Sequence, residues 1–471
     1  MKDLTHGGIH KHLTFMSVPI MMGMFVHTLN FMVELYFVGK LGSAALAGVG
    51  SVGVLVFFVL AATQVLNVGM GTLISHAVGR KDKSHANTLF NQGIFISILC
   101  MIGVIIFGLL LAPIYFDALA PDTATLKASL DYFYWFLPAL ALQFPITAIA
   151  AALRGTGVVK LPMLINIVAV ILNMLLSPLL ITGKVFGMAL GVAGAALASS
   201  IAMALGFVGL FLYLKYKECY LGLTFKQCLP NGVEIKRIIG LGLPAGGELL
   251  FTFVYMSVIY WVLRDFDASA QAGFGVGVRV MQALFLPAMA VALAGPAIAG
   301  QNFASGNMRR VLNTYHQMAW MTCGLMLILN GLCVFYADIF ITPFSNEQEV
   351  IVVATVFLSY VCFNFIPAGY VLTVSAMFKA LGNVWPALLS TVIRLSLFSV
   401  PVITLSLTST ISLEIIWSIS ASSVYIQAVV SHFLLKRELY KKGLQLVSFG
   451  ECKAKWPPLY RAKDTPNKSA S

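Results

Sequence analysis

The chain has 471 residues, of which 59% are hydrophobic and only 10% are charged, and its mean hydropathy is +0.89. Soluble domains carry about a quarter charged residues, so this composition excludes a protein whose whole surface faces water. The formal net charge of +12 would suit nucleic-acid binding only if the basic residues gathered in one patch.

Apolar stretches long enough to cross a bilayer recur along the whole chain. A spanning helix needs about 20 apolar residues, because its backbone must satisfy its own hydrogen bonds inside the membrane. We predict twelve such spans, at 13–38, 44–75, 90–117, 127–153, 161–183, 188–214, 236–264, 269–302, 312–337, 350–378, 386–408 and 411–436. The chain is therefore expected to be an all-α integral membrane protein.

Most of the 30 Lys and Arg residues fall in the termini and in every second loop between these spans. The exceptions are Lys40, Lys127, Lys184 and Arg264 on the opposite side and Arg279 and Arg394 within spans. Basic loops stay in the cytoplasm, so we expect a multi-pass protein of the cell membrane, the inner membrane of a bacterium, with both termini cytoplasmic. The positive charge then reflects topology, and no nucleic-acid partner is expected.

Segments of the chain match each other at one constant offset of 225 positions. The matching pairs include Pro19 with Pro244, Ala47-Gly48 with Ala272-Gly273, His76 with Gln301, and Arg154 with Lys379. Two copies read in the same direction predict two pseudo-symmetric six-helix bundles, a parallel repeat with a cavity between the halves. We place the amino-terminal lobe at 1–214, a cytoplasmic linker at 215–235, the carboxy-terminal lobe at 236–440 and a basic tail at 441–471.

Glu34 is an acidic residue inside the first predicted span. A carboxylate within the membrane costs several kcal/mol unless it is neutralised or paired, which makes it a functional candidate. His27, Asn30 and Glu34 are three and four residues apart, so they share one helical face, which we expect to point into the lobe. We take the three as candidates for proton or cation coupling. The alternatives are a solvated position at the membrane rim for Glu34 and, for His27, a hydrogen-bonded core position, which we favour over a proton relay.

Glu248 lies inside the seventh predicted span and shares a helical face with Thr252 and Tyr255. We expect these three residues to line the substrate cavity. The repeat offset aligns Glu248 with Gly23, so it is not the counterpart of Glu34, and the two lobes are expected to do different work. The alternative for Glu248 is a salt bridge with Lys236 or Arg237 near the membrane interface.

Three stretches of the sequence together resemble the multidrug and toxic compound extrusion (MATE) family. They are "VELYFVGKLGSAALAGVG", "ALRGTGVVKLPMLINIVAVILNMLLSPLL" and "GVAGAALASS". The resemblance covers all twelve predicted spans. It implies two six-helix bundles around a V-shaped chamber and cation-driven efflux of amphipathic, often cationic compounds.

The resemblance also implies roles for individual residues. Glu34 occupies the position of a first-helix acid that is usually Asp, and Asn173 that of the fifth-helix Asn of a cation site. Ser177 replaces an Asp expected one turn later, Ser199 resembles a sixth-helix Thr, and Glu248 resembles a seventh-helix Glu.

These departures bear on the coupling ion. A Na⁺ ion at Glu34 and Asn173 would have one carboxylate and the oxygens of Asn173, Ser177 and Ser199, which is little negative charge for a dehydrated cation. A single carboxyl group shielded from water can instead exchange a proton in the working pH range. We hypothesise an antiporter with H⁺ as the coupling ion, ahead of Na⁺, and expect no other cofactor.

Other functions stay open at this point. A lipid-linked precursor flippase of the same superfamily should have a basic central cavity, whereas the cations that we place within spans are Arg279 and Arg394. An intramembrane enzyme is disfavoured because the spans carry no recognisable catalytic arrangement. We expect a small-molecule substrate (a drug or toxic metabolite), surrounding membrane lipid as partner, function as a monomer, and no enzymatic activity.

Overall fold

The computed structural model describes residues 2–443 apart from 184–186, 188, 218–219, 225–226, 228, 343–346 and 409–411. The described residues form helices and contain no β-strand. The predicted basic tail lies outside them after residue 443. The first half of the chain forms α1 Ile9–Gly39, α2 Ser43–Gly79, α3 Lys83–Leu119, α4 Thr123–Gly155, α5 Lys160–Thr182 and α6 Gly191–Tyr216. The second half forms α7 Gly232–Leu263, α8 Ala268–Ala304, α9 Met308–Ile341, α10 Gln348–Cys362, α11 Phe365–Ala380, α12 Trp385–Thr408 and α13 Leu413–Lys441.

The two halves repeat one backbone design at the offset predicted from the sequence. α2 begins at Ser43 and α8 begins at its counterpart position, Ala268. Even the turns agree: Gly157 (φ 79°) after α4 and Gly382 (φ 75°) after α11 both adopt the left-handed conformation that glycine tolerates best. The prediction of a two-repeat helical membrane fold is confirmed.

Eleven described helices are long and apolar enough to cross a membrane, and the bent pair α10 and α11 supplies a twelfth span. The predicted single span at 350–378 is thus two helices, bent by 58°. Pro367 explains the break, because it has no N–H to donate to the carbonyl of Phe363 four residues earlier. That carbonyl accepts a hydrogen bond from the Tyr425 hydroxyl of α13 instead, at 2.8 Å.

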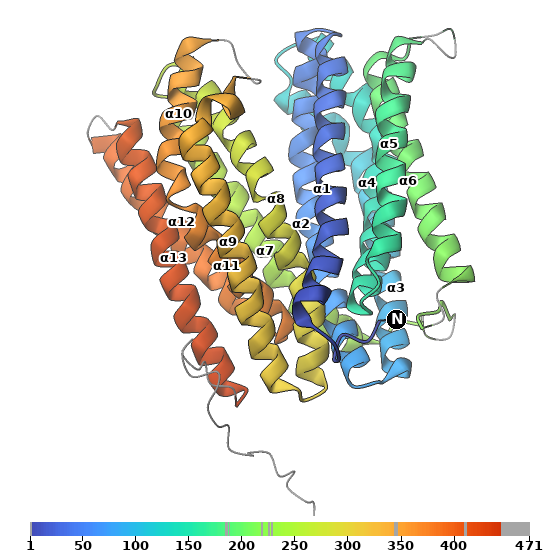
Figure 1. Cartoon of the computed structure of the whole chain (residues 1–471). Coiled ribbons are helices and arrows are strands. Elements are labelled where there is room, and N and C mark those ends of the chain that lie inside the picture. The colour runs from blue at the N-terminus through green and yellow to red at the C-terminus, as the bar shows by residue number, and fades with distance from the viewer. Residues whose placement is uncertain are drawn as a thin grey trace, which may run out of the picture.

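Figure 1 shows the helices of each half gathered into one bundle, with the amino end of α1 and the carboxy end of α13 at the same end of the molecule. The bundles meet where α2 packs on α7 and α8, and where α1 packs on α8. Small residues permit this approach. A side chain at Gly242 of α7 would collide with the backbone carbonyl of Val65 in α2, so the two helices touch backbone to backbone there.

Described residues between α6 and α7 are hydrogen-bonded to the amino-terminal bundle. Gln92 of α3 donates to the carbonyl of Leu229 at 2.7 Å, and its own carbonyl oxygen accepts from the backbone N–H of Asn231 at 2.9 Å. Asn87 donates to the carbonyl of Tyr220 at 3.1 Å. The connection predicted as a linker therefore rests on the start of α3.

Candidate functional site

A cavity of about 330 Å³ lies between the two lobes. Five helices contribute to its wall: α2 and α4 from the amino-terminal lobe and α7, α8 and α11 from the carboxy-terminal lobe. Its lining residues are Gln64, Asn67, Val68, Gly71, Thr72, Arg154, Gly155, Ala245, Glu248, Leu249, Thr252, Met289, Ala292, Leu293, Pro296, Ala297, Leu372, Ser375, Ala376 and Lys379. This volume is in the range of small-molecule sites, so the cavity can accept part or all of a drug-sized compound.

Matched residues of the two repeats line the cavity from both sides. Each lining residue of α2 has its counterpart, at the repeat offset, among the lining residues of α8. The pairs are Gln64 with Met289, Asn67 with Ala292, Val68 with Leu293, Gly71 with Pro296, and Thr72 with Ala297. The α2 wall is mostly polar and the α8 wall is apolar, so a bound compound would meet two chemically different faces.

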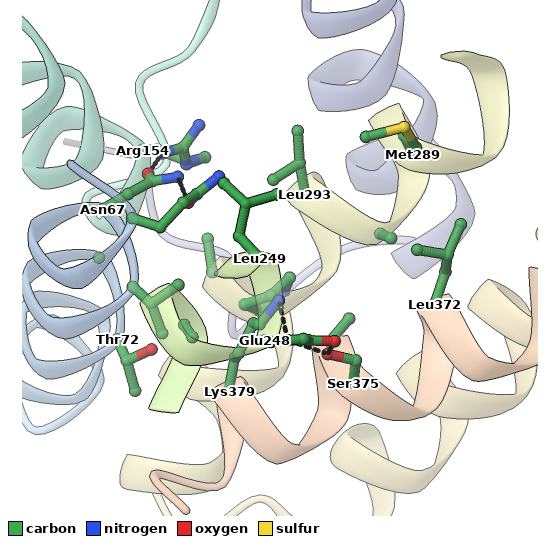
Figure 2. Close-up of a pocket in the computed structure, with 18 of the residues that line it drawn as sticks. Asn67, Thr72, Arg154, Glu248, Leu249, Met289, Leu293, Leu372, Ser375 and Lys379 are labelled. Atoms are coloured by element: carbon green, nitrogen blue, oxygen red, sulfur yellow. Dashed lines mark hydrogen bonds and ion pairs between the residues drawn. The ribbon is translucent and has the colours of Figure 1, made fainter. Parts of the chain in front are cut away.

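Glu248 of α7 sits in a small polar cluster on the carboxy-terminal side of this cavity. Its carboxylate accepts a hydrogen bond from the Ser375 hydroxyl, with oxygen distances of 3.2 and 3.3 Å. The Lys379 ammonium lies 3.6 Å from Glu248 Oε2, and both side chains are 24% exposed. Figure 2 shows the three side chains converging from α7 and α11. The alternative of a pair with Lys236 or Arg237 is not what the structure shows.

Arg154 of α4 lies on the opposite side of the cavity (Figure 2). Its guanidinium donates to the side-chain carbonyl of Asn67. The Asn67 amide in turn donates to Gln64 Oε1 at 2.7 Å. These contacts orient Arg154 without neutralising it, because an amide oxygen carries no net charge. No carboxylate in the described part of the chain forms an ion pair with it.

The predicted spans end at 153 and 378 and so leave Arg154 and Lys379 in cytoplasmic loops; the structure corrects this prediction. Both lie in the last turn of a helix, α4 and α11 respectively, and both face the cavity. The repeat already paired the two residues as matched positions of the two copies. A sequence offset, however, does not reveal that both side chains face the cavity.

Two hydrogen bonds cross between the lobes beside the cavity, of which Gly155 is a lining residue. His76 of α2 bonds through Nε2 to the carbonyl of Ala380 at 2.7 Å, and Gln301 of α8 donates to the carbonyl of Gly155 at 2.9 Å. These two bonds are counterparts, because 76 and 301, like 155 and 380, differ by the repeat offset. The backbone N–H of the fully buried Leu4 also donates to Gln301 Oε1, at 3.0 Å, so the amino-terminal segment adds a contact to this connection between the lobes.

Glu34 of α1 points into the amino-terminal lobe. Its carboxylate accepts a hydrogen bond from the hydroxyl of Tyr132 in α4, at 2.8 Å. Tyr132 is itself buried and stacks on Phe136 with a centroid distance of 5.3 Å. The Glu34 side chain is half-buried, and its hydrogen bond to a buried phenol favours an inward direction over a solvated rim position.

The structure brings Asn173 and Ser199 together, with Asn173 donating to the Ser199 hydroxyl at 3.1 Å between α5 and α6. Ser177 is buried in the same lobe, and its hydroxyl has no hydrogen-bond partner among the described residues. No hydrogen bond joins these described residues to Glu34, whose partner is Tyr132. The carboxyl group and the Asn173–Ser199 pair are therefore two separate polar positions in one lobe.

Two of the remaining predicted residues of α1 behave differently from each other. Asn30 is buried, as expected for a side chain directed into the bundle. His27 is exposed, although the shared helical face predicted that it would point inward with Glu34. The reason is packing: most buried residues of α1 lie at or before Gly23, and after it only Asn30 and Val38 are buried, so residues on one face need not share one environment.

Of the residues predicted to line the cavity with Glu248, only one does so. Thr252 lines the cavity, and its hydroxyl donates to the Glu248 carbonyl at 2.9 Å. Tyr255 is not part of the wall; it is buried in the carboxy-terminal lobe, where its hydroxyl lies 2.7 Å from Ser420 Oγ. The Arg394 guanidinium lies 4.5 Å from the centre of its ring. Tyr255 lies seven residues beyond Glu248, about two turns further along α7, at a level where residues of α12 and α13 cover this face of the helix.

Comparisons with known proteins point to one family. The MatE family model matches residues 19–179 and again residues 244–405, so the starts of the two matches differ by the repeat offset. A probable multidrug resistance protein of Bacillus subtilis is 26% identical over 388 residues, which are 80% of this chain and 86% of that protein. An FAD transporter of Shewanella oneidensis is 23% identical over 412 residues, 85% of this chain and 89% of that protein.

Solved structures agree on the fold. An outward-facing multidrug resistance MATE family transporter has a TM-score of 0.86 at 20% identity, covering 93% of this chain and 98% of that chain. A transporter of the MOP superfamily from Pyrococcus furiosus, described as having a binding pocket of reverse polarity, has a TM-score of 0.87 at 21% identity with the same coverage. With the family model matching more than half of its residues, the chain belongs to the multidrug and toxic compound extrusion (MatE) family and is a multi-pass membrane transporter, not an enzyme.

Proposed function

We propose that this protein is a secondary active antiporter that exports amphipathic drugs or toxic metabolites in exchange for H⁺. One observation carries the proposal: a small-molecule cavity lies between two lobes, and in the amino-terminal lobe the half-buried Glu34 carboxylate accepts a hydrogen bond from the buried phenol of Tyr132. The names of the relatives, multidrug resistance and export proteins among them, support export of small molecules. We place the protein in the inner membrane of a bacterium, with both termini in the cytoplasm, working as a monomer.

The proton is preferred over Na⁺ on the geometry of the amino-terminal lobe. A dehydrated Na⁺ needs several oxygen ligands at one point, but Asn173 and Ser199 bond to each other and Glu34 bonds to Tyr132. A proton needs only the carboxyl group. When Glu34 is ionised it accepts from the Tyr132 hydroxyl, and when it takes a proton that hydrogen bond loses its charge assistance.

Alternating access follows from this change in charge. Protonation of Glu34 from the outside would loosen its bond to α4 and let the amino-terminal lobe repack, which would alter the cavity and release the substrate outward. Return of the lobes would release the proton to the cytoplasm. Such coupling requires that proton and substrate prefer different conformations, since a ligand shifts an equilibrium only by its differential affinity.

The test is accumulation of fluorescent amphipathic dyes of both charges in everted vesicles, where export from the cell corresponds to uptake, or their transport in proteoliposomes, under an imposed pH gradient or an imposed Na⁺ gradient. We expect export to follow the pH gradient and Glu34→Gln to reduce it at least about tenfold, because the amide cannot carry the proton. Glu414→Gln, which alters an exposed acid at the start of α13, is the control and should behave as the unchanged protein. A Na⁺ requirement without response to pH would refute proton coupling, and full export by Glu34→Gln would remove Glu34 from the mechanism.

A second candidate function is transfer of a lipid-linked precursor across the membrane. Arg154 and Lys379 favour it, since they give the cavity the basic residues that the sequence analysis missed. Glu248 opposes it by pairing with Lys379. A flippase assay with a fluorescent phospholipid or polyprenyl phosphate, run in the same proteoliposomes, distinguishes the two functions: the antiporter proposal expects no gradient-dependent movement of the lipid.

A further inference from the structure

The cavity between the lobes has an unbalanced charge. Its charged lining residues are Arg154, Lys379 and Glu248. Glu248 and Lys379 neutralise each other at 3.6 Å. The guanidinium of Arg154 remains, held by the neutral side chain of Asn67. The described wall of the cavity therefore carries one cation in excess.

This excess charge lies where water is scarce. Arg154 is only partly exposed, and next to it the wall continues into apolar side chains of α7 and α8, such as Leu249 and Leu293. A guanidinium removed from bulk water attracts an anion far more strongly than one on the surface, because the surrounding dielectric is low. Guanidinium groups also bind carboxylate, sulfonate and phosphate groups through paired N–H donors.

We infer that the cavity binds amphipathic compounds through an anionic group that contacts Arg154, with the apolar part of the compound against α8. This deepens the proposed function and rests on it: the exported class is anionic or zwitterionic rather than cationic, in contrast to what the family resemblance implied. Asn67 and Gln64 hold the guanidinium in place for the anion. Glu248 limits the affinity by keeping Lys379 occupied.

The binding test uses three dyes built on the same xanthene ring system: fluorescein (anionic), rhodamine B (zwitterionic) and rhodamine 123 (cationic). Fluorescence polarisation with the purified full-length protein in detergent at neutral pH measures their affinities. We expect fluorescein to bind at least about tenfold more tightly than rhodamine 123, with rhodamine B between them, from one low-dielectric charge contact.

Variants locate the effect at Arg154. Arg154→Gln keeps an amide donor for Asn67 but loses the charge, and we expect it to weaken fluorescein binding about tenfold without weakening rhodamine 123 binding. Arg154→Lys should restore most of the fluorescein affinity. Glu248→Gln should strengthen fluorescein binding by freeing Lys379. Arg279→Gln removes the same charge from an exposed position outside the cavity wall and should change neither dye.

Several results would overturn the inference: preference for rhodamine 123, equal affinity for the three dyes, no binding of any dye, or equal loss of both dyes in Arg154→Gln. The test is independent of coupling, because no gradient is present. A protein that prefers fluorescein but shows no gradient-driven export would refute the proposed antiport and leave the charge preference standing. Gradient-driven export of cationic dyes alone would refute the charge preference and leave the proposed antiport standing.

Discussion

In the amino-terminal lobe a set of polar side chains occupies the interior, and the same five backbone positions in the carboxy-terminal lobe are apolar. The pairs, matched at the repeat offset, are Glu34 and Ile259, Tyr132 and Phe357, Asn173 and Phe398, Ser177 and Val402, and Ser199 and Val424. All five carboxy-terminal residues are buried, at 4% exposure or less. At these five positions the amino-terminal lobe therefore has a carboxyl group that can change charge, whereas the carboxy-terminal lobe has only apolar side chains.

The carboxy-terminal lobe has polar groups of its own at other positions. Tyr255 contacts both the Arg394 guanidinium, which lies over its ring, and the Ser420 hydroxyl. At two of the corresponding positions the amino-terminal lobe has Ala169 and Ala195. The two repeats therefore share one backbone arrangement but carry most of their buried polar groups, which are costly within a membrane, at different positions.

The largest expected effect comes from making the two lobes alike. Glu34→Ile gives the amino-terminal lobe the residue that its twin has at that position. Gradient-driven dye export should fall at least about a hundredfold, since among the described residues of that lobe no other acidic side chain is buried. The melting temperature of the purified protein should not fall, because an apolar side chain in the membrane costs less than a carboxylate. Retained export would show that the difference between the lobes is not functional.

The second prediction concerns the two hydrogen bonds that cross between the lobes. His76→Leu removes one of them, and we expect roughly a tenfold loss of export, from a lost buried hydrogen bond of about 1–3 kcal/mol. His76→Gln, which copies Gln301 of the other repeat, is the matched control and should stay within about threefold of the unchanged protein. Labelling of a cysteine at Thr72 by a membrane-impermeant thiol reagent should speed up in His76→Leu only. Equal behaviour of the two variants would contradict a role for the bond.

A smaller effect is expected from Tyr132→Phe, which again copies the other lobe. Loss of the hydroxyl removes the hydrogen bond to Glu34, and export should fall about three- to tenfold. Tyr255→Phe is the control: it removes a buried hydroxyl from the carboxy-terminal lobe and should lower the melting temperature without altering the response to the pH gradient. If both variants changed that response equally, the lobes would share the coupling work.

The smallest effect is predicted for Ser375→Ala. This change removes a hydroxyl that donates to Glu248 at 3.2 and 3.3 Å, but Lys379 remains 3.6 Å away to pair with the carboxylate. Dye affinity should change by no more than about threefold, and coupling should not change. A larger loss, measured by the same polarisation assay, would mean that the hydroxyl contacts the substrate itself.

Much of the architecture could be predicted from the sequence because it depends on local or periodic properties. The repeat offset, the twelve apolar spans and the family resemblance all rest on residues near one another in the chain or on a fixed period. Glu34 stood out for a similar reason, since a carboxyl group in a long apolar stretch is unusual wherever that stretch packs. The break between α10 and α11 escaped prediction, since Pro367 alone did not reveal that Tyr425 would satisfy the freed carbonyl of Phe363.

The direction of a side chain, by contrast, was decided by tertiary packing. Helical periodicity placed His27 with Glu34 and Tyr255 with Glu248, yet His27 is exposed and Tyr255 faces α12 and α13, because neighbouring helices differ from turn to turn along α1 and α7. The sequence alone determined that two related helical bundles cross a membrane, since hydropathy and repetition are properties of the chain itself. Only the tertiary structure determined that Arg154 and Lys379 share a cavity, because that cavity exists where residues from opposite halves of the chain meet.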